Sequence, residues 1–121
     1  MAISDAQSNA IVQNTYGIAP AVSLTAVSST GGGTALDGAV IRPNATMVVV
    51  SSAGVSAGSV QLQGSLDGTN WFSLGSAVTT STASTVFAPV VVTNALTRFV
   101  RANVATAITG GTISATVGVS G

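Results

Sequence analysis

Two side chains of types that bind ligands in many proteins lie within the short stretch 64-GSLDGTNWFSL-74. Asp67 supplies a carboxylate, and Trp71 is the only tryptophan of the chain. An aspartate a few residues from an exposed tryptophan can form a ligand site, because the indole offers a large apolar surface with a polar tip. The same stretch can be a β-hairpin, since Asp-Gly between apolar residues is a strong turn signal. The other residues of the chain must decide between these two interpretations.

The sequence offers few groups for catalysis. It contains no cysteine, histidine or lysine, so its serines and threonines have no such base beside them to activate a nucleophile. Acid-base catalysis by paired carboxylates would require two of Asp5, Asp37 and Asp67 to converge. The glycine clusters 31-GGG-33 and 110-GG-111 lack the lysine and the helix of a phosphate-binding loop. We therefore expect no enzyme activity, no metal site and no cofactor.

Charge is unusually scarce in this sequence. Charged residues make up 5% of the chain, whereas an average domain has about 25%. The net charge is zero, which argues against nucleic acid as a partner because that binding requires a positive field. So few charges give a monomer little protection against association. We interpret the surface as one that other protein covers; the alternative is a surface kept wet by its many Ser, Thr, Asn and Gln side chains.

The pattern along the chain separates an arm, residues 1–20, from a single domain, residues 21–121. In the domain, short stretches rich in Val, Ile and Thr alternate with Gly, Ser and Asn clusters, as in sandwiches and barrels. We predict an all-β fold, an antiparallel β-sandwich of jelly-roll or Ig-like type with an extended N-terminal arm. Pro89 indicates an edge position or a bulge, since proline cannot donate to the strand ladder. The predicted strands are 21–27, 38–42, 45–52, 58–66, 70–76, 84–92, 97–105 and 111–119. The turn signals are 31–34, 37–38, 67–68, Asn94 and 110–111.

The stretch 64–74 is therefore predicted to form a β-hairpin. If Asp67 and Gly68 are the two central residues of a type I′ turn, Gly64 faces Trp71 across the two strands. The indole would lie over the space left by Gly64, in or beside the core. We expect Asp67 to stabilise the turn by accepting bonds from nearby backbone amides, with ligand binding as the alternative.

The same register predicts a set of interface residues. Phe72 and Leu74 would point away from the core, although a longer turn would exchange the two faces of their strand. Strand alternation places Arg101 on the face opposite Val100, where it can bond a neighbour. We therefore predict Phe72, Leu74 and Arg101 as interface residues, together with Tyr16 of the arm.

Three segments carry a resemblance to a known group of proteins. The stretches 58-GSVQLQGSLDGTNW-71, 98-RFVRANV-104 and 110-GGTISATV-117 resemble small β-sandwich structural proteins of tailed-phage virions, notably head decoration proteins. The resemblance covers residues 58–119. It implies a structural virion protein, a capsid decoration (cement) protein that binds and stabilises the assembled phage head. It also implies the major capsid protein as a partner on the capsid surface. Copies of the chain itself are expected as further partners, as a homotrimer, because subunits clustered around a symmetry axis would let each arm reach its neighbour and raise avidity.

A second resemblance leaves an alternative open. The pattern S-x-D-G-x-x-W with a later R-F-V-R is also similar to discoidin-like carbohydrate-binding sandwiches. The chain would then be a carbohydrate-binding module, or a tail or fibre component of a virion, with Trp71 or Tyr16 as the stacking platform. The start, MAISDAQSNAIVQ, lacks the basic and apolar regions of a secretory signal, and no apolar run approaches the roughly 20 residues of a membrane span. We therefore expect synthesis in the host cytoplasm and no membrane partner.

Overall fold

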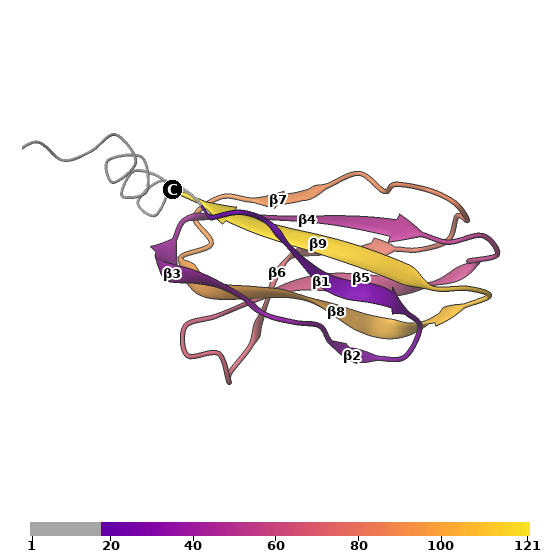
Figure 1. Ribbon diagram of the computed structural model, residues 1–121, viewed down its shortest axis with the longest axis horizontal. Coiled ribbons are helices and arrows are strands. Elements are labelled where there is room, and N and C mark those ends of the chain that lie inside the picture. Colours follow the sequence, from indigo (N-terminus) through magenta and orange to yellow (C-terminus); the bar gives the residue numbers. More distant parts are fainter. Residues whose placement is uncertain (1–17) are drawn as a thin grey trace, which may run out of the picture.

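The computed structural model describes residues 18–121 and shows two antiparallel β-sheets packed face to face (Figure 1). No helix occurs in this part of the chain. The strands are β1 (Ala21–Val27), β2 (Gly31–Gly32), β3 (Leu36–Arg42), β4 (Asn44–Ser51), β5 (Ala57–Ser65), β6 (Phe72–Thr79), β7 (Val90–Val92), β8 (Thr97–Thr109) and β9 (Ile113–Ser120). The prediction of an all-β sandwich is confirmed.

The smaller sheet has the order β1-β9-β4-β7, and the larger sheet has the order β2-β8-β5-β6 with β3 also paired to β8. Since β2 and β3 pair with the same strand, they act as one interrupted strand of the larger sheet. Counted in this way, each sheet has four strand positions, and their order is that of the double Greek key called a jelly roll.

The core lies between the two sheets and follows the period-two alternation of the strands. In the smaller sheet, β4 and β9 bury every second side chain along their length. In the larger sheet, β5 does so from Val60 to Gly64 and β8 from Val100 to Val104. The innermost side chains are Met47, Val49, Val60, Leu62, Val100, Val104, Ile113 and Val117. Small and branched apolar residues thus fill the layer, so the few large aromatic side chains are not needed there.

Most predicted strands are confirmed, but one predicted strand (84–92) and two predicted turns (31–34 and 37–38) differ. Asp37 and Gly38 lie inside β3, where Asp37 pairs with Phe99 of β8. The first strand spans 21–27 as expected, and Pro89 immediately precedes β7, which is an edge strand of the smaller sheet. The predicted strand 84–92 is reduced to β7 and a single bridge between Val86 and Val50. The expected turn at 31–34 contains the short strand β2, because the two glycines pair with Val104 and Asn103 of β8.

The predicted register of the hairpin is wrong by one residue. Gly64 pairs with Phe72 rather than Trp71, and Leu62 pairs with Leu74. The connection is a loop of residues 66–71, and only Gly68 of its residues has a positive φ (78°), so no type I′ turn forms. The longer loop exchanges the two faces of β6.

The shifted register moves two predicted residues. Leu74, expected at an interface, is buried in the core with 6% of its surface exposed. The space above Gly64 is filled by Thr97 and Leu74, since a Cβ on Gly64 would lie 2.6 Å from Thr97 Oγ1 and 3.0 Å from Leu74 Cδ1. Trp71 is therefore excluded from the core and lies half-buried in the loop.

Candidate functional site

The loop 66–71 is organised around the carboxylate of Asp67. This group accepts hydrogen bonds from the backbone amides of Thr69 and Asn70, both at 2.8 Å, and from Asn70 Nδ2 at 2.7 Å. The hydroxyl of Ser65 donates a fourth bond at 3.0 Å. These donors, the two amides first, hold the pKa of Asp67 well below its usual range. The predicted turn role of Asp67 is confirmed, and its carboxylate oxygens accept their hydrogen bonds from neighbouring residues of the same loop and its base.

The base of this loop is fixed to the larger sheet by Thr97. Ser65 donates its backbone amide to Thr97 Oγ1 at 2.8 Å, and that hydroxyl lies 3.0 Å from the carbonyl oxygen of Ser65. The hydroxyl of Ser65 in turn accepts the amide of Gly68 at 2.9 Å. Gly64 allows this arrangement because its missing side chain leaves room for Thr97. Gly64, at the end of β5, and Gly68, in the loop, thus both have structural roles, but their contacts differ from those that the sequence predicted.

Trp71 and Arg101 form the most chemically distinctive group on the outer face of the larger sheet. The guanidinium carbon of Arg101 lies 4.2 Å from the centroid of the Trp71 ring, a cation–π distance. Arg101 Nε donates to Gln63 Oε1 at 2.8 Å, and β5 and β8 pair these two residues directly. A Cβ on Gly32 would lie 2.4 Å from the guanidinium carbon, so the planar group rests against the backbone of β2. Three contacts therefore hold the Arg101 guanidinium in one orientation.

The electrostatics of this group follow from its surroundings. Burial lowers the pKa of Arg101 from its ordinary value, but an arginine remains charged under all physiological conditions. The remaining guanidinium nitrogens donate no hydrogen bond to any residue from 18 to 121. Arg101 is therefore a charged side chain held by Trp71, Gln63 and the backbone of β2.

The other two arginines of residues 18–121, Arg98 and Arg42, bind groups within the fold. Asp37 and Arg98 form an exposed ion pair with Nε–Oδ1 and Nη2–Oδ2 distances of 2.9 and 3.1 Å. The Arg98 side chain, and then the amide of Ala39, lower the pKa of Asp37. Arg42 is fully buried and donates to the carbonyl oxygens of Gly38 and Gly121 at 2.8 and 3.2 Å. Both arginines thus stabilise the fold at the end of the sandwich where β3 lies.

The outer face of the smaller sheet has the opposite character. Its four strands contain no charged residue. Strand pairing places one set of side chains on this face, away from the core. We call it the valine–threonine face, and it consists of Val22, Asn44, Thr46, Val48, Val50, Val86, Val91, Ser114, Thr116, Gly118 and Ser120. Four of its valines are strongly exposed: Val22 at 55%, Val50 at 41%, Val86 at 67% and Val91 at 64%. This face thus combines exposed valines with small uncharged polar side chains and carries no charge on any of the four strands.

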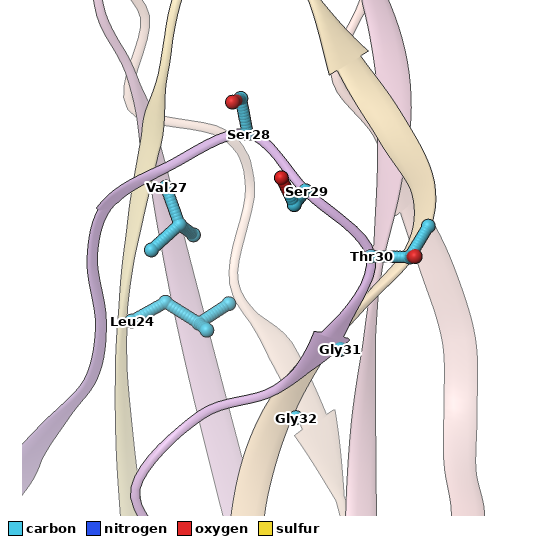
Figure 2. Close-up of a pocket in the computed structure, with 7 residues that line it drawn as sticks. All are labelled: Leu24, Val27, Ser28, Ser29, Thr30, Gly31 and Gly32. Carbon is cyan, nitrogen blue, oxygen red and sulfur yellow. The ribbon is translucent and has the colours of Figure 1, made fainter.

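A hollow of about 270 Å³ lies beside the turn between β1 and β2 (Figure 2). It is lined by Leu24, Val27, Ser28, Ser29, Thr30, Gly31 and Gly32. These residues supply hydroxyl and backbone groups but no titratable side chain. The hollow can therefore accept hydrogen-bonding or apolar groups, yet none of its side chains can act as a general acid or base at neutral pH.

The four residues predicted to lie at an interface occupy different places in the structure. Arg101 lies on the outer face of the larger sheet as expected, Phe72 is 40% exposed at the start of β6, and Leu74 is in the core. Tyr16 lies outside the described residues. The sequence reasoning missed the valine–threonine face, although the absence of charge from 44–51 and 113–120 was a usable signal. It also missed Gln63 as the partner of Arg101, which depends on strand register.

Within residues 18–121, no cluster of three or more acidic, histidine or cysteine side chains is placed to hold a metal ion. The same part of the chain has no helix long and apolar enough to cross a membrane. Comparison with protein families found no family model that matches the chain, and comparison with curated proteins found no match.

Proposed function

We propose that the chain is a structural virion protein, a capsid decoration protein that binds the assembled phage head and stabilises it. The observation that carries this proposal is the valine–threonine face, an uncharged sheet surface with strongly exposed valines. Large contiguous apolar surfaces on soluble proteins commonly mark sites where another protein binds. The major capsid protein is the partner we propose for this face, on the outer surface of the head.

The physics of such an attachment favours apolar contact over charge. Each Å² of apolar surface removed from water contributes about 25 cal/mol, and the valine–threonine face supplies such surface from four strands. Its threonine and serine hydroxyls can fix orientation through hydrogen bonds at little desolvation cost compared with charges. The six charged side chains of the whole chain are too few for an interface dominated by ion pairs. Attachment should therefore depend little on salt.

The jelly-roll strand order is compatible with this role. Jelly rolls form viral capsid domains and also lectin domains, so the fold alone does not select between them. The residue types point away from catalysis, because a chain without histidine, cysteine, lysine or glutamate lacks most of the usual acid-base groups. We accordingly propose no enzyme activity, no cofactor, no nucleic-acid partner and no membrane partner, with synthesis in the host cytoplasm.

A carbohydrate-binding module, or a tail or fibre component with that activity, is the second candidate. It is favoured by Arg101, which stacks on the half-buried Trp71 and donates a hydrogen bond to Gln63, since aromatic, amide and guanidinium groups all bind sugars. One face of the indole, however, carries the Arg101 guanidinium at 4.2 Å. A sugar ring could stack only on the other face, which makes this candidate the weaker one.

The test is a binding measurement with undecorated heads of the phage that encodes the chain. The purified protein is mixed with these particles, sedimented with them, and its occupancy is measured from low to high sodium chloride. We expect saturable binding that changes little with salt. Absence of binding, or binding lost at moderate salt, would contradict the proposal. Specific retention on a glycan array would support the carbohydrate module instead.

A further inference from the structure

The edges of the two sheets are the places where another chain could add a strand. An exposed edge strand presents unpaired N–H and C=O groups, and proteins commonly protect such strands with charged side chains, lysine above all, or with proline, bulges or very short strands. This sequence has no lysine and six charged residues in all. Its edges therefore depend on backbone geometry rather than on charge.

Three of the four sheet edges in residues 18–121 consist of short or interrupted strands. β7 has three residues and follows Pro89, whereas β2 has two residues and β3, on the same edge, shifts register against β8. β1 shifts register twice against β9, and its Ser23 accepts the amide of Thr34 on the other side. The fourth edge is β6, which has eight residues, Phe72–Thr79, with no charge and no proline.

β6 is bulged in its middle. Its register shifts between the pairs that it forms with Leu62 and Val60 of β5, so that Gln61 alone lies opposite residues 75–77. Gly75 has a φ of 67°, far from the values of a regular strand. A bulge bends its strand and interrupts the row of groups that an added strand would bond.

The side chain of Gln61 holds this bulge in place. Its Nε2 donates to the carbonyl oxygens of Leu74 at 2.9 Å and Gly75 at 3.2 Å, and lies 2.9 Å from the carbonyl oxygen of Leu62. In a regular antiparallel strand, the carbonyl groups of consecutive residues point to opposite sides. One of the carbonyls of Leu74 and Gly75 would therefore point to the free edge, but here a single nitrogen binds both.

The bulge also brings β6 against the other sheet. A Cβ on Gly75 would lie 3.0 Å from Val90 Cγ1 and 3.1 Å from Val92 Cγ2. The side chains of β7 therefore cover the backbone of β6 at this point, and the edges of the two sheets are in contact there.

We propose that Gln61 prevents a second copy of this chain from adding its β6 strand to the edge of β6. A second copy is the partner because two uncharged β6 strands can pair about a two-fold axis without repulsion between like charges. The bulge is the protection that β6 has, and Gln61 is the side chain that fixes it. This role does not depend on what the valine–threonine face binds.

Self-association of purified full-length variants tests the proposal. Gln61→Met keeps the length of the side chain but removes the donor, and Gly75→Ala disfavours the positive φ of the bulge by a separate route. The matched control is Gln63→Met, on the same strand and face, because Gln63 bonds Arg101 instead of β6.

Sedimentation velocity is measured over a concentration series for the wild type and each variant, and thermal unfolding verifies that each is folded. We expect Gln61→Met and Gly75→Ala to self-associate at concentrations about tenfold lower than the wild type, the size of effect that one hydrogen bond gives. Gln63→Met should self-associate like the wild type.

Two further measurements identify β6 as the strand that pairs. The backbone amides of β6 should exchange with solvent more slowly in associated Gln61→Met than in the wild type, because an added strand bonds them. Ser76→Lys, at an exposed residue of the bulge, should return Gln61→Met to wild-type behaviour, since lysine protects edge strands.

Unchanged association of folded Gln61→Met would overturn the proposal, as would association that Ser76→Lys does not reverse and that leaves the β6 amides unprotected. If Gln61→Met does not fold, Gly75→Ala decides by the same two criteria.

Discussion

The register of β5 and β6 makes a sharp prediction about two neighbouring side chains, Leu74 and Phe72. Leu74 has 6% of its surface exposed and packs in the core, whereas Phe72 is 40% exposed at the end of the sheet. Leu74→Ala removes three carbon atoms from the core, a loss of about 2.4 kcal/mol at roughly 0.8 kcal/mol per carbon. The cavity left behind adds to this, so the full cost lies in the range of about 2–5 kcal/mol.

For a chain of this length, that loss lowers the Tm by about 10 °C or more. Phe72→Ala is the matched control and should cost less than half as much in the free energy of unfolding, although phenylalanine is the larger residue. Urea titrations followed by circular dichroism and by the fluorescence of Trp71 give both values. A two-residue turn would place Leu74 outside the core, so a Phe72→Ala variant less stable than Leu74→Ala would refute the register.

Three further predictions concern the glycine, arginine and aspartate that shape the same end of the sandwich. Gly64→Ala should cost about 1–3 kcal/mol in urea unfolding, because its Cβ would lie 2.6 Å from Thr97 Oγ1; a neutral result would show that Thr97 can move aside. Arg42→Ala should cost about 3–5 kcal/mol, since it removes a fully buried side chain and its bond to the carbonyl oxygen of Gly38, whereas Arg98→Ala should change the Tm little. Four hydrogen bonds lower the pKa of Asp67 in the folded protein. The ionised carboxylate therefore stabilises the folded state fully when the pH is above the ordinary aspartate pKa of about 3.9. This stabilisation is lost as the pH falls through the lower pKa of the folded state. Asp67→Asn should therefore be less stable than the wild type at neutral pH and should show a smaller further loss in acid, and parallel pH profiles of the two proteins would contradict this.

Most strands could be predicted from the sequence because the alternation of buried and exposed side chains is a property of each segment by itself. In β8, the sequence placed Val100, Ala102 and Val104 on one face and Arg101 on the other, and the three apolar residues are buried. The same alternation located most strands, since a side chain's face is a local property once a strand forms. It also provided the edge position next to Pro89, because the missing amide acts locally.

The hairpin was not predictable in this way because its loop length depends on distant contacts. Asp67-Gly68 fits a two-residue turn by sequence, but Thr97, 32 residues from Ser65, fixes the base of a longer loop. The strand β2 likewise consists of two glycines with no strand signal of their own, which pair with β8 far along the chain. The stacking of Trp71 on Arg101 follows from both contacts and could not be found before the register was known.

The most direct test of the central claim is to place one charge in the middle of the valine–threonine face. Thr116 lies between Val22 and Val48 on that face, and Thr116→Lys leaves the core untouched. The matched control is Ser56→Lys, which adds the same charge on an exposed loop between β4 and β5. Occupancy on undecorated heads is measured for both proteins beside the wild type. We expect Thr116→Lys to bind at least about tenfold more weakly, because attachment would bury an unpaired charge, and Ser56→Lys to bind like the wild type. Equal binding of the two lysine variants, with both proteins folded, would contradict the assignment of this face as the attachment surface.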